Sequence, residues 1–446
     1  MHGDLKLEDG GVKADSKHVL SGRYPELGSE PIPIEPYVSP QYYELEKKHL
    51  FKKVWIHVGR VEEIPGAGDY FVKQLDACDA SVLVVRNREG AIHAFHNVCA
   101  HRMNKMAYTE RGSTKKFFCK FHGWAYDLDG RLVGVPDEQC FAGLKREEHG
   151  LSPVHLEIWQ GFIFVNFDRM PSQSLNDFLR PMYGELEGYP FEKMTSCYSW
   201  SAVVNCNWKL ALDAFQETYH VSYVHGRSIA GALLKSDAGG LRPLDGLCGD
   251  YHRRLSIAGN PKSVYGNPNA LTSASNGEAP ASANRPIGEA ALRFGRGGAR
   301  FDVAQEDLPR AINWTRHPNW AFDINVLFPD FYLSTRPNYY QAYNFRPLAH
   351  DKFWFDARVY YPEMTTAGGR FYQEYMKVSL RDVLLEDLST LEHNQAACAT
   401  RAKTHMVLQD FEIMVRHQFT VIERMIREGQ ASEGRSSEGR AGEARH

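Results

Sequence analysis

The sequence contains no uninterrupted run of about 18 apolar residues, so no segment is predicted to cross a membrane as a helix. Its first residues lack the basic-then-apolar pattern of a secretory signal. Eight cysteines in 446 residues do not make a disulfide framework, and this usage fits a reducing cytoplasm best. The formal net charge of -3 gives no reason to expect nucleic-acid binding.

What is present is an ordinary globular composition, with 43% hydrophobic and 24% charged residues, which is enough to bury a sizeable core. The length predicts two domains, or one large domain with an insertion. We divide the chain by its changes in pattern into four segments: an N-terminal arm and helix (1–45), a first domain (46–168), a second domain (169–428) and a disordered tail (429–446).

The first domain has the signals of short strands. Residues 81–86 form a valine-rich apolar run, and residues 157–167 alternate aromatic and β-branched side chains around Gly161. Asp129 and Gly130 form a hairpin signal between two further strand-like stretches. These patterns predict a small all-β domain.

The second domain mixes helical and strand-like patterns. Helices are expected at 207–224, 371–399 and 406–427, and strands at 321–327, 331–334 and 353–360. Residues 259–300 are rich in Gly, Ala, Ser and Asn, which is typical either of a functional lid or of a disordered segment.

Two Cys-plus-His pairs lie in the first domain. Cys99 and His101 are followed, after 17 intervening residues, by Cys119 and His122. A two-iron cluster with two thiolates on one iron and two imidazoles on the other needs this mixed set. The same four side chains could also build a zinc site, so the spacing alone leaves both metals open.

A second group of metal-binding residue types lies at the start of the second domain. Asp213, Glu217 and His220 are spaced to share one face of a helix, whereas His225 lies roughly 140° further round at 3.6 residues per turn. Both histidines can reach one metal only if the helix distorts or ends between them. Two histidines and a carboxylate would form the facial triad of non-haem iron oxygenases.

Residues 119–130 resemble the second cluster loop of Rieske oxygenases almost residue for residue, and Arg102 also matches that family. Met103 departs from the family's usual glycine but removes no ligand. Residues 207–226 resemble the family's iron-binding helix, with Ala214 where the family often has asparagine. On these motifs we identify the chain as similar to the large, or alpha, terminal subunit of Rieske non-haem iron ring-hydroxylating oxygenases.

The resemblance also implies the third iron ligand. Residues 386–395 resemble the family's late helix, whose register selects Asp387, with Glu386 as the nearest rival. Asp213 could in principle compete, but its own register in the family corresponds to an acidic position that is not a ligand. The implied iron ligands are therefore His220, His225 and Asp387, and the implied cluster ligands are Cys99, His101, Cys119 and His122.

The resemblance implies an α+β fold: an all-β Rieske [2Fe-2S] domain joined to a Bet v1-like, START-like helix-grip catalytic domain with an antiparallel sheet. It implies a [2Fe-2S] cluster, a mononuclear Fe(II) and O2 as co-substrate, with electrons from NAD(P)H through a partner reductase, ferredoxin or both. It further implies a head-to-tail homotrimer, with or without a beta subunit, in which Glu217 bridges His220 and His122 of the neighbouring chain.

The reaction expected is hydroxylation of an aromatic or polycyclic apolar substrate. The alternative is a monooxygenase that hydroxylates or demethylates a quaternary ammonium or methoxy compound, and a more remote alternative is an electron carrier with the Rieske cluster alone. Lys115, Lys116 and Lys120 flank the cluster loop and could steer an acidic ferredoxin.

Overall fold

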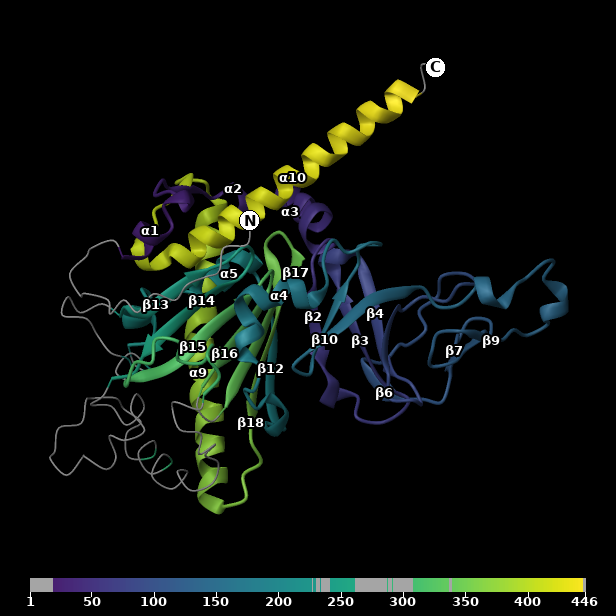
Figure 1. Ribbon diagram of the computed structural model, residues 1–446, viewed down its shortest axis with the longest axis horizontal. Helices are drawn as coiled ribbons and strands as arrows, with labels where there is room; N and C mark the ends of the chain where they lie inside the picture. The colour runs from purple at the N-terminus through teal and green to yellow at the C-terminus, as the bar shows by residue number, and fades with distance from the viewer. Residues whose placement is uncertain are drawn as a thin grey trace.

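The computed structural model describes residues 19–226, 228–229, 233, 241–260, 287, 291, 308–336 and 339–443 (Figure 1). The glycine-rich stretch 259–300 therefore lies almost wholly outside the described residues. None of the helices in the described part is both long and apolar enough to cross a membrane.

The N-terminal domain is built on an antiparallel sheet in the strand order β2-β11-β10-β5-β4-β3-β6. This confirms the all-β prediction, because the valine-rich run is β4 and the stretch around Gly161 is the β10–β11 hairpin. The strands are β2 (Ile56–Arg60), β3 (Asp69–Leu75), β4 (Ala80–Arg86), β5 (Ile92–His96), β6 (Arg111–Ser113), β10 (Pro153–Trp159) and β11 (Phe162–Asn166).

A three-stranded sheet extends from this domain, formed by β7 (Phe117–Phe118), β8 (Ala125–Tyr126) and β9 (Leu132–Gly134). Asp127 closes the predicted hairpin, since its carboxylate accepts hydrogen bonds from the backbone N–H groups of Asp129 and Arg131 at 3.0 and 2.8 Å. Figure 1 shows β7 and β9 at the end of the molecule farthest from the C-terminal domain.

The C-terminal domain holds a second antiparallel sheet, in the order β12-β18-β17-β16-β15-β14-β13, with the long helix α9 lying along it (Figure 1). A long helix against a curved sheet is the helix-grip arrangement expected. The strands are β12 (Ser196–Val204), β13 (Pro243–Cys248), β14 (Arg253–Ala258), β15 (Trp320–Leu327), β16 (Phe331–Thr335), β17 (Tyr340–Ala349) and β18 (Lys352–Tyr361).

Segments near the two ends of the chain pack together beside this sheet. Ser39 caps the predicted N-terminal helix by accepting a hydrogen bond from the backbone N–H of Tyr42. A two-stranded sheet pairs β1 (Ile32–Pro33) with β19 (His405–Met406). The helices are α1 (Val19–Arg23), α2 (Glu35–Val38), α3 (Pro40–Glu46), α4 (Leu175–Tyr183), α5 (Trp208–Ala214), α6 (Val221–Val224), α9 (Ala367–Ala399) and α10 (Ile413–Glu443).

The disorder predicted for residues 429–446 is wrong for most of that segment, because α10 continues without a break to Glu443. The segment contains no proline, so nothing removes a helical hydrogen bond. Lys48 also forms an exposed ion pair of 2.6 Å with Glu433, so this part of α10 lies beside the N-terminal helix.

The two domains meet through buried polar contacts rather than through apolar packing alone. Glu63 of the N-terminal domain forms an ion pair of 2.8 Å with Arg358 on β18. His57 on β2 lies 2.9 Å from the side-chain oxygen of Asn344 and stacks on Phe331, with ring centroids 3.9 Å apart. These contacts fix the orientation of one domain against the other.

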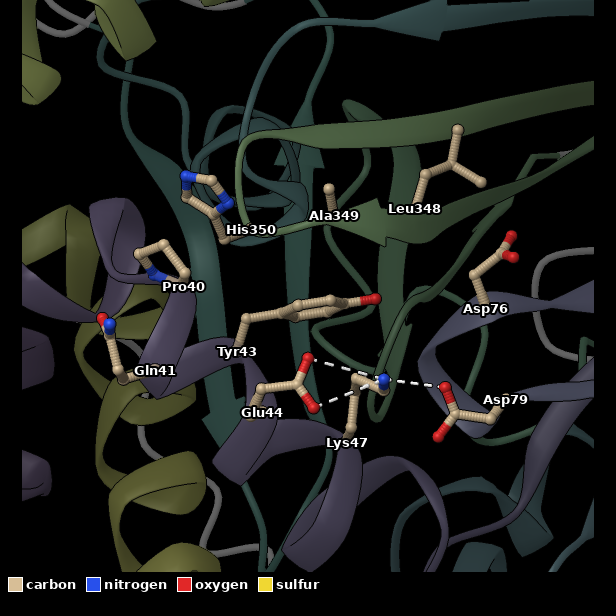
Figure 2. A pocket seen from close by; sticks show the side chains of 10 residues that line it. All are labelled: Pro40, Gln41, Tyr43, Glu44, Lys47, Asp76, Asp79, Leu348, Ala349 and His350. Carbon is tan, nitrogen blue, oxygen red and sulfur yellow. Dashed lines mark hydrogen bonds and ion pairs between the residues drawn. The ribbon is translucent and has the colours of Figure 1, made fainter.

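The N-terminal helix contributes to the same junction. Figure 2 shows Lys47, just beyond α3, between Glu44 and Asp79, where a polar hollow opens beside the β17–β18 turn. Lys47 lies 2.7 Å from Asp79 and 3.4 Å from Glu44. Asp79 belongs to the N-terminal domain, so this cation joins the helix to that domain.

We predict that Glu63→Gln weakens the domain junction. Burial would raise the pKa of Glu63, but Arg358 and other nearby cations lower it to about 2. A carboxyl with a depressed folded-state pKa stabilises the protein above its unfolded pKa, and this contribution is lost as the pH falls from roughly 4.5 toward 2. Breaking a buried ion pair costs on the order of 3 kcal/mol.

The measurement is the urea unfolding midpoint of the metal-replete protein, followed from pH 7 downward. The gap between wild type and Glu63→Gln should narrow as the pH falls below about 4.5. Glu138→Gln is the matched control, since Glu138 pairs with Arg146 on the open surface and exposed pairs contribute little. Equal unfolding midpoints of wild type and Glu63→Gln at pH 7 would show that the Glu63–Arg358 pair does not stabilise the junction.

Candidate metal centres

The two Cys-plus-His pairs lie on adjacent tight loops of the N-terminal domain. Each loop turns back at its cysteine: the N–H of Cys99 donates to the carbonyl of Asn104, and that of Cys119 to the carbonyl of Trp124, both at 2.8 Å. The two thiols are buried. Thiolates in this position need cations, and a metal centre would supply them.

The two histidines of the pairs face each other. The ring centroids of His101 and His122 are 4.5 Å apart, and His101 also stacks on Trp124 at 4.9 Å. The Nδ1 atom of His101 is buried without a hydrogen-bond partner. A buried nitrogen left without a partner costs free energy, and ligation to an iron would satisfy it. The four predicted residues therefore fit a cluster.

Met103 follows the first pair and adopts a positive φ of 59°. Residues other than glycine are strained at such a positive φ. This explains why the family that the sequence resembles has glycine there. The loop keeps its shape despite the substitution, with the N–H of Met103 donating to the carbonyl of Cys99 at 3.1 Å.

The predicted helix 207–224 is interrupted between α5 and α6, at residues 215–220. Glu217 provides the physical reason, because its carboxylate accepts hydrogen bonds from the backbone N–H groups of Tyr219 and His220. Such side-chain bonds replace the helical ones and let the chain turn. The break is what allows His220 and His225 to face one point, as the sequence required.

His220, His225 and Asp387 converge on one point. The two Nε2 atoms are 3.3 Å apart, and Asp387 Oδ1 lies 3.5 Å from Nε2 of His220 and 2.9 Å from Nε2 of His225. Within the described residues this is the group of three whose ligand atoms all lie within 4.8 Å of one another. Asp387 comes from α9, so the site joins distant parts of the chain.

The charges at this point favour a cation. Burial would lower the pKa of His220, but the carboxylates of Asp387 and Glu217 outweigh that effect and raise it to about 10. Burial would likewise raise the pKa of Asp387, and the two imidazoles lower it instead. The site stabilises positive charge, as a site for a divalent metal must.

Glu386, the rival ligand, has a different place. Its Oε2 atom lies 2.8 Å from Nδ1 of His225 and accepts a hydrogen bond of 2.5 Å from Ser228. It thus holds the face of the imidazole that points away from the metal position. The sequence missed this role, although the adjacency of Glu386 to Asp387 was a usable signal.

Asp213 lies away from the three ligands. Gln216 and Gln418 both donate hydrogen bonds of 2.9 Å to its Oδ1 atom, and its burial raises the pKa to about 7. It therefore stabilises the packing of α5 against α10, and the prediction that it is not a ligand agrees with this geometry.

A cavity of about 190 Å³ opens beside the three converging side chains. Ala214 lines it, so the absence of an asparagine there leaves room in the cavity. Its other lining residues are mostly apolar and aromatic, among them Phe215, Phe322, Tyr332, Tyr339 and Tyr343. A small molecule in this cavity would lie next to the metal position.

Comparison with known protein families gives two matches. Residues 54–151 match the Rieske [2Fe-2S] domain, and residues 191–428, more than half of the chain, match the catalytic domain of the ring hydroxylating alpha subunit. These domains hold a Rieske cluster and a mononuclear iron that reacts with O2. The residues described above fit both groups.

Individual relatives are of two kinds. The chain is 34% identical over 204 residues to the oxygenase subunit of glycine betaine monooxygenase from Chromohalobacter salexigens, covering 44% of each chain. It is 34% identical over 196 residues to the alpha subunit of biphenyl 2,3-dioxygenase from Rhodococcus jostii, covering 41% of each. The matched stretches thus span less than half the length of these relatives.

Solved structures show the same fold over most of the chain. Naphthalene 1,2-dioxygenase from Rhodococcus sp. is 20% identical with a TM-score of 0.66, covering 89% of this chain and 94% of that one. The quaternary ammonium Rieske monooxygenase CntA, bound to L-carnitine, is 17% identical with a TM-score of 0.64, covering 88% and 94%. The chain belongs to the family of Rieske ring-hydroxylating oxygenase alpha subunits.

Proposed function

We propose that this protein is the terminal component of an oxygenase system, which uses O2 and electrons from NAD(P)H to hydroxylate a small molecule. The observation that carries the proposal is the convergence of His220, His225 and Asp387 beside a mostly apolar cavity, in a chain that also carries a Rieske domain. Iron bound by this triad keeps coordination positions free for dioxygen. An electron carrier would need neither the triad nor the cavity.

The geometry of the two sites supports an assignment of the metal ligands. We assign Cys99, His101, Cys119 and His122 to the cluster, whereas the mononuclear iron is held by the two histidines and the aspartate that converge beside the cavity. Electrons come from a separate reductase, with or without a ferredoxin. Lys115, Lys116 and Lys120 are exposed beside the cluster loops, which supports docking of an acidic partner there.

Electron transfer from cluster to iron is proposed to cross between chains. The cluster loops lie at the end of the molecule away from the iron site of the same chain (Figure 1). A head-to-tail trimer, which is a closed ring of heterologous contacts, would bring the cluster of one chain to the iron of its neighbour. Glu217 would then bridge the partner's His122 and its own His220.

Exposed aromatic side chains beside the cluster loops and beside the iron site support this arrangement. Phe118 and Phe121 beside the cluster loops are 60% and 54% exposed, and Tyr219 and Tyr223 beside the iron site are 54% and 80% exposed. Apolar patches of this kind mark protein interfaces. Contact between the two patches in a ring would bury both.

The proposal is tested with the purified protein loaded with both metals. Nitric oxide, which binds Fe(II) with open positions, should give a high-spin iron–nitrosyl EPR signal of about one per chain. With NAD(P)H, a reductase and ¹⁸O2, the isotope should appear in a product from one of four probes: biphenyl, anthranilate, glycine betaine or choline. A protein that forms no nitrosyl signal and incorporates no oxygen would refute it.

We predict that Cys99→Ser or His122→Ala abolishes the cluster. Wild-type protein should be brown and, once reduced, give a rhombic EPR signal with an average g value below that of the free electron. Each variant removes a ligand, so this signal should disappear. A colourless wild-type protein that binds one zinc and no sulfide would contradict the cluster assignment.

We also predict that Glu386→Gln weakens the binding of iron. Loss of a carboxylate that orients a metal-bound imidazole typically costs roughly 10- to 100-fold in metal affinity. Iron content after dialysis against a graded chelator is the measurement. Asp382→Asn, on the same helix with a side chain that is 48% exposed, is the control. An unchanged iron affinity would show that Glu386 does not position His225.

A further inference from the structure

One cation lines the cavity without belonging to the metal site. The described residues around the cavity include three acidic or imidazole ligands, Glu217, and a ring of apolar and aromatic side chains. Arg336, at the end of β16, is the one arginine or lysine among them. A guanidinium in a mostly apolar cavity is costly unless an anion meets it.

Arg336 is held in place by its surroundings. Its guanidinium carbon lies 3.9 Å from the centroid of the Phe322 ring and 5.2 Å from that of Tyr339. The hydroxyl of Tyr189 donates to the backbone carbonyls of Arg336 and Tyr339, at 2.7 and 3.1 Å. Both the side chain and its backbone are therefore positioned before any ligand arrives.

What the side chain lacks is a counter-ion. Its Nε atom is buried without a hydrogen-bond partner, and no ion pair joins Arg336 to a described residue. The buried carboxylate of Asp387 in the same cavity is already engaged by the two imidazoles. A buried, unpaired donor carries a desolvation penalty that a bound anion would remove.

We propose that the substrate carries a carboxylate, and that Arg336 binds it and so presents the rest of the molecule to the iron. This rests on the proposed function, whose substrate class it narrows. The planar guanidinium fork matches a carboxylate in a bidentate way. The cavity, about 190 Å³ and lined mostly by apolar and aromatic side chains, is suited to a small molecule.

The inference disfavours the hydrocarbon substrate expected from the sequence. An unsubstituted aromatic hydrocarbon would cover Arg336 without pairing it, and so would leave a buried charge unsatisfied. An aromatic acid or a trimethylammonium carboxylate would satisfy it. In either case the rest of the substrate, an aromatic ring or a trimethylammonium group, would contact aromatic rings such as Phe215, Tyr332 and Tyr343.

The test measures binding, and so does not depend on turnover. Isothermal titration calorimetry on the metal-replete protein compares two pairs of probes that differ in the carboxylate: glycine betaine with choline, and benzoate with benzamide. In at least one pair the wild type should bind the carboxylate about 10- to 100-fold more tightly, as expected for a hydrogen-bonded charge pair. Arg336→Gln should remove that preference, and Arg336→Lys should retain part of it.

Arg381→Gln is the matched control, since Arg381 is exposed on α9 and pairs with the adjacent Asp382. It should keep the carboxylate preference. The cluster spectrum of each variant confirms that it is folded. The proposal is overturned if neither carboxylate binds the wild type more tightly than its counterpart without a carboxylate, or if Arg336→Gln keeps the preference.

The outcomes also separate this inference from the proposed function. If carboxylate-selective binding depends on Arg336 but the protein incorporates no oxygen, the proposed oxygenase function is refuted and the role of Arg336 in binding a carboxylate stands. If oxygen is incorporated into biphenyl or choline and Arg336→Gln does not affect it, the role of Arg336 in binding a carboxylate is refuted and the oxygenase function stands.

Discussion

Removing any one of His220, His225 and Asp387 as its alanine variant should eliminate the mononuclear iron and product formation, while the cluster spectrum remains. Each side chain supplies one of three ligand atoms that lie 2.9 to 3.5 Å from one another. Two ligands cannot hold the metal in the cavity, and iron is what activates dioxygen there. The cluster loops lie in the other domain, so their ligands are unaffected.

Iron and sulfide analysis, the EPR spectrum of the reduced cluster and product yield are measured on the same preparations. The expected loss of product is complete within detection. His393→Ala provides the control, because His393 is exposed on α9 shortly after Asp387 and should leave iron content and yield unchanged. If Asp387→Ala retained oxygenation, the carboxylate role would move to Glu386 or elsewhere.

Glu217→Gln should keep both metals and yet lose turnover, by on the order of 100-fold or more. Glu217 is buried, and its carboxylate contacts Nδ1 of His220 and accepts a hydrogen bond from the backbone N–H of the same residue. In the proposed trimer its other neighbour is the partner's His122. An amide replaces one acceptor with a donor, so the two imidazoles can no longer share it.

Single-turnover product yield of metal-replete Glu217→Gln protein is the measurement, with the trimer verified by light scattering. Glu363→Gln, at an exposed position, should behave as wild type. Near-normal turnover in Glu217→Gln, or a fully active monomeric wild type, would show that the bridge between chains is wrong.

The ligand sets were predictable because their signals are local. The two Cys-plus-His pairs and the Glu217–His225 stretch each occupy one short segment, where spacing reports geometry directly. Asp387 is distant in sequence from the histidines, so only its resemblance to a known helix selected it over Glu386. The hydrogen bonds that distinguish the two acids, to His225 and Ser228, exist only in the folded chain.

Other features could not be read from local pattern. The helix expected at 207–224 is broken because the Glu217 side chain competes for backbone N–H groups, which periodicity does not register. Residues 429–443 have the composition of a disordered tail but continue α10. Arg336 follows an ordinary strand, and its importance comes from Phe322, Tyr339 and the cavity, which are assembled by tertiary folding.

The central claim is that electrons stored in the cluster are used for oxygenation at the iron held by the His220–His225–Asp387 triad. It is tested most directly by a single turnover: metal-replete protein is reduced chemically, freed of reductant, and exposed to O2 with whichever of the four probes takes up oxygen. The account predicts product in proportion to the clusters oxidised, and none in the Asp387→Ala protein. Product formed equally without the mononuclear iron, or clusters oxidised with no product in the wild type, would contradict it.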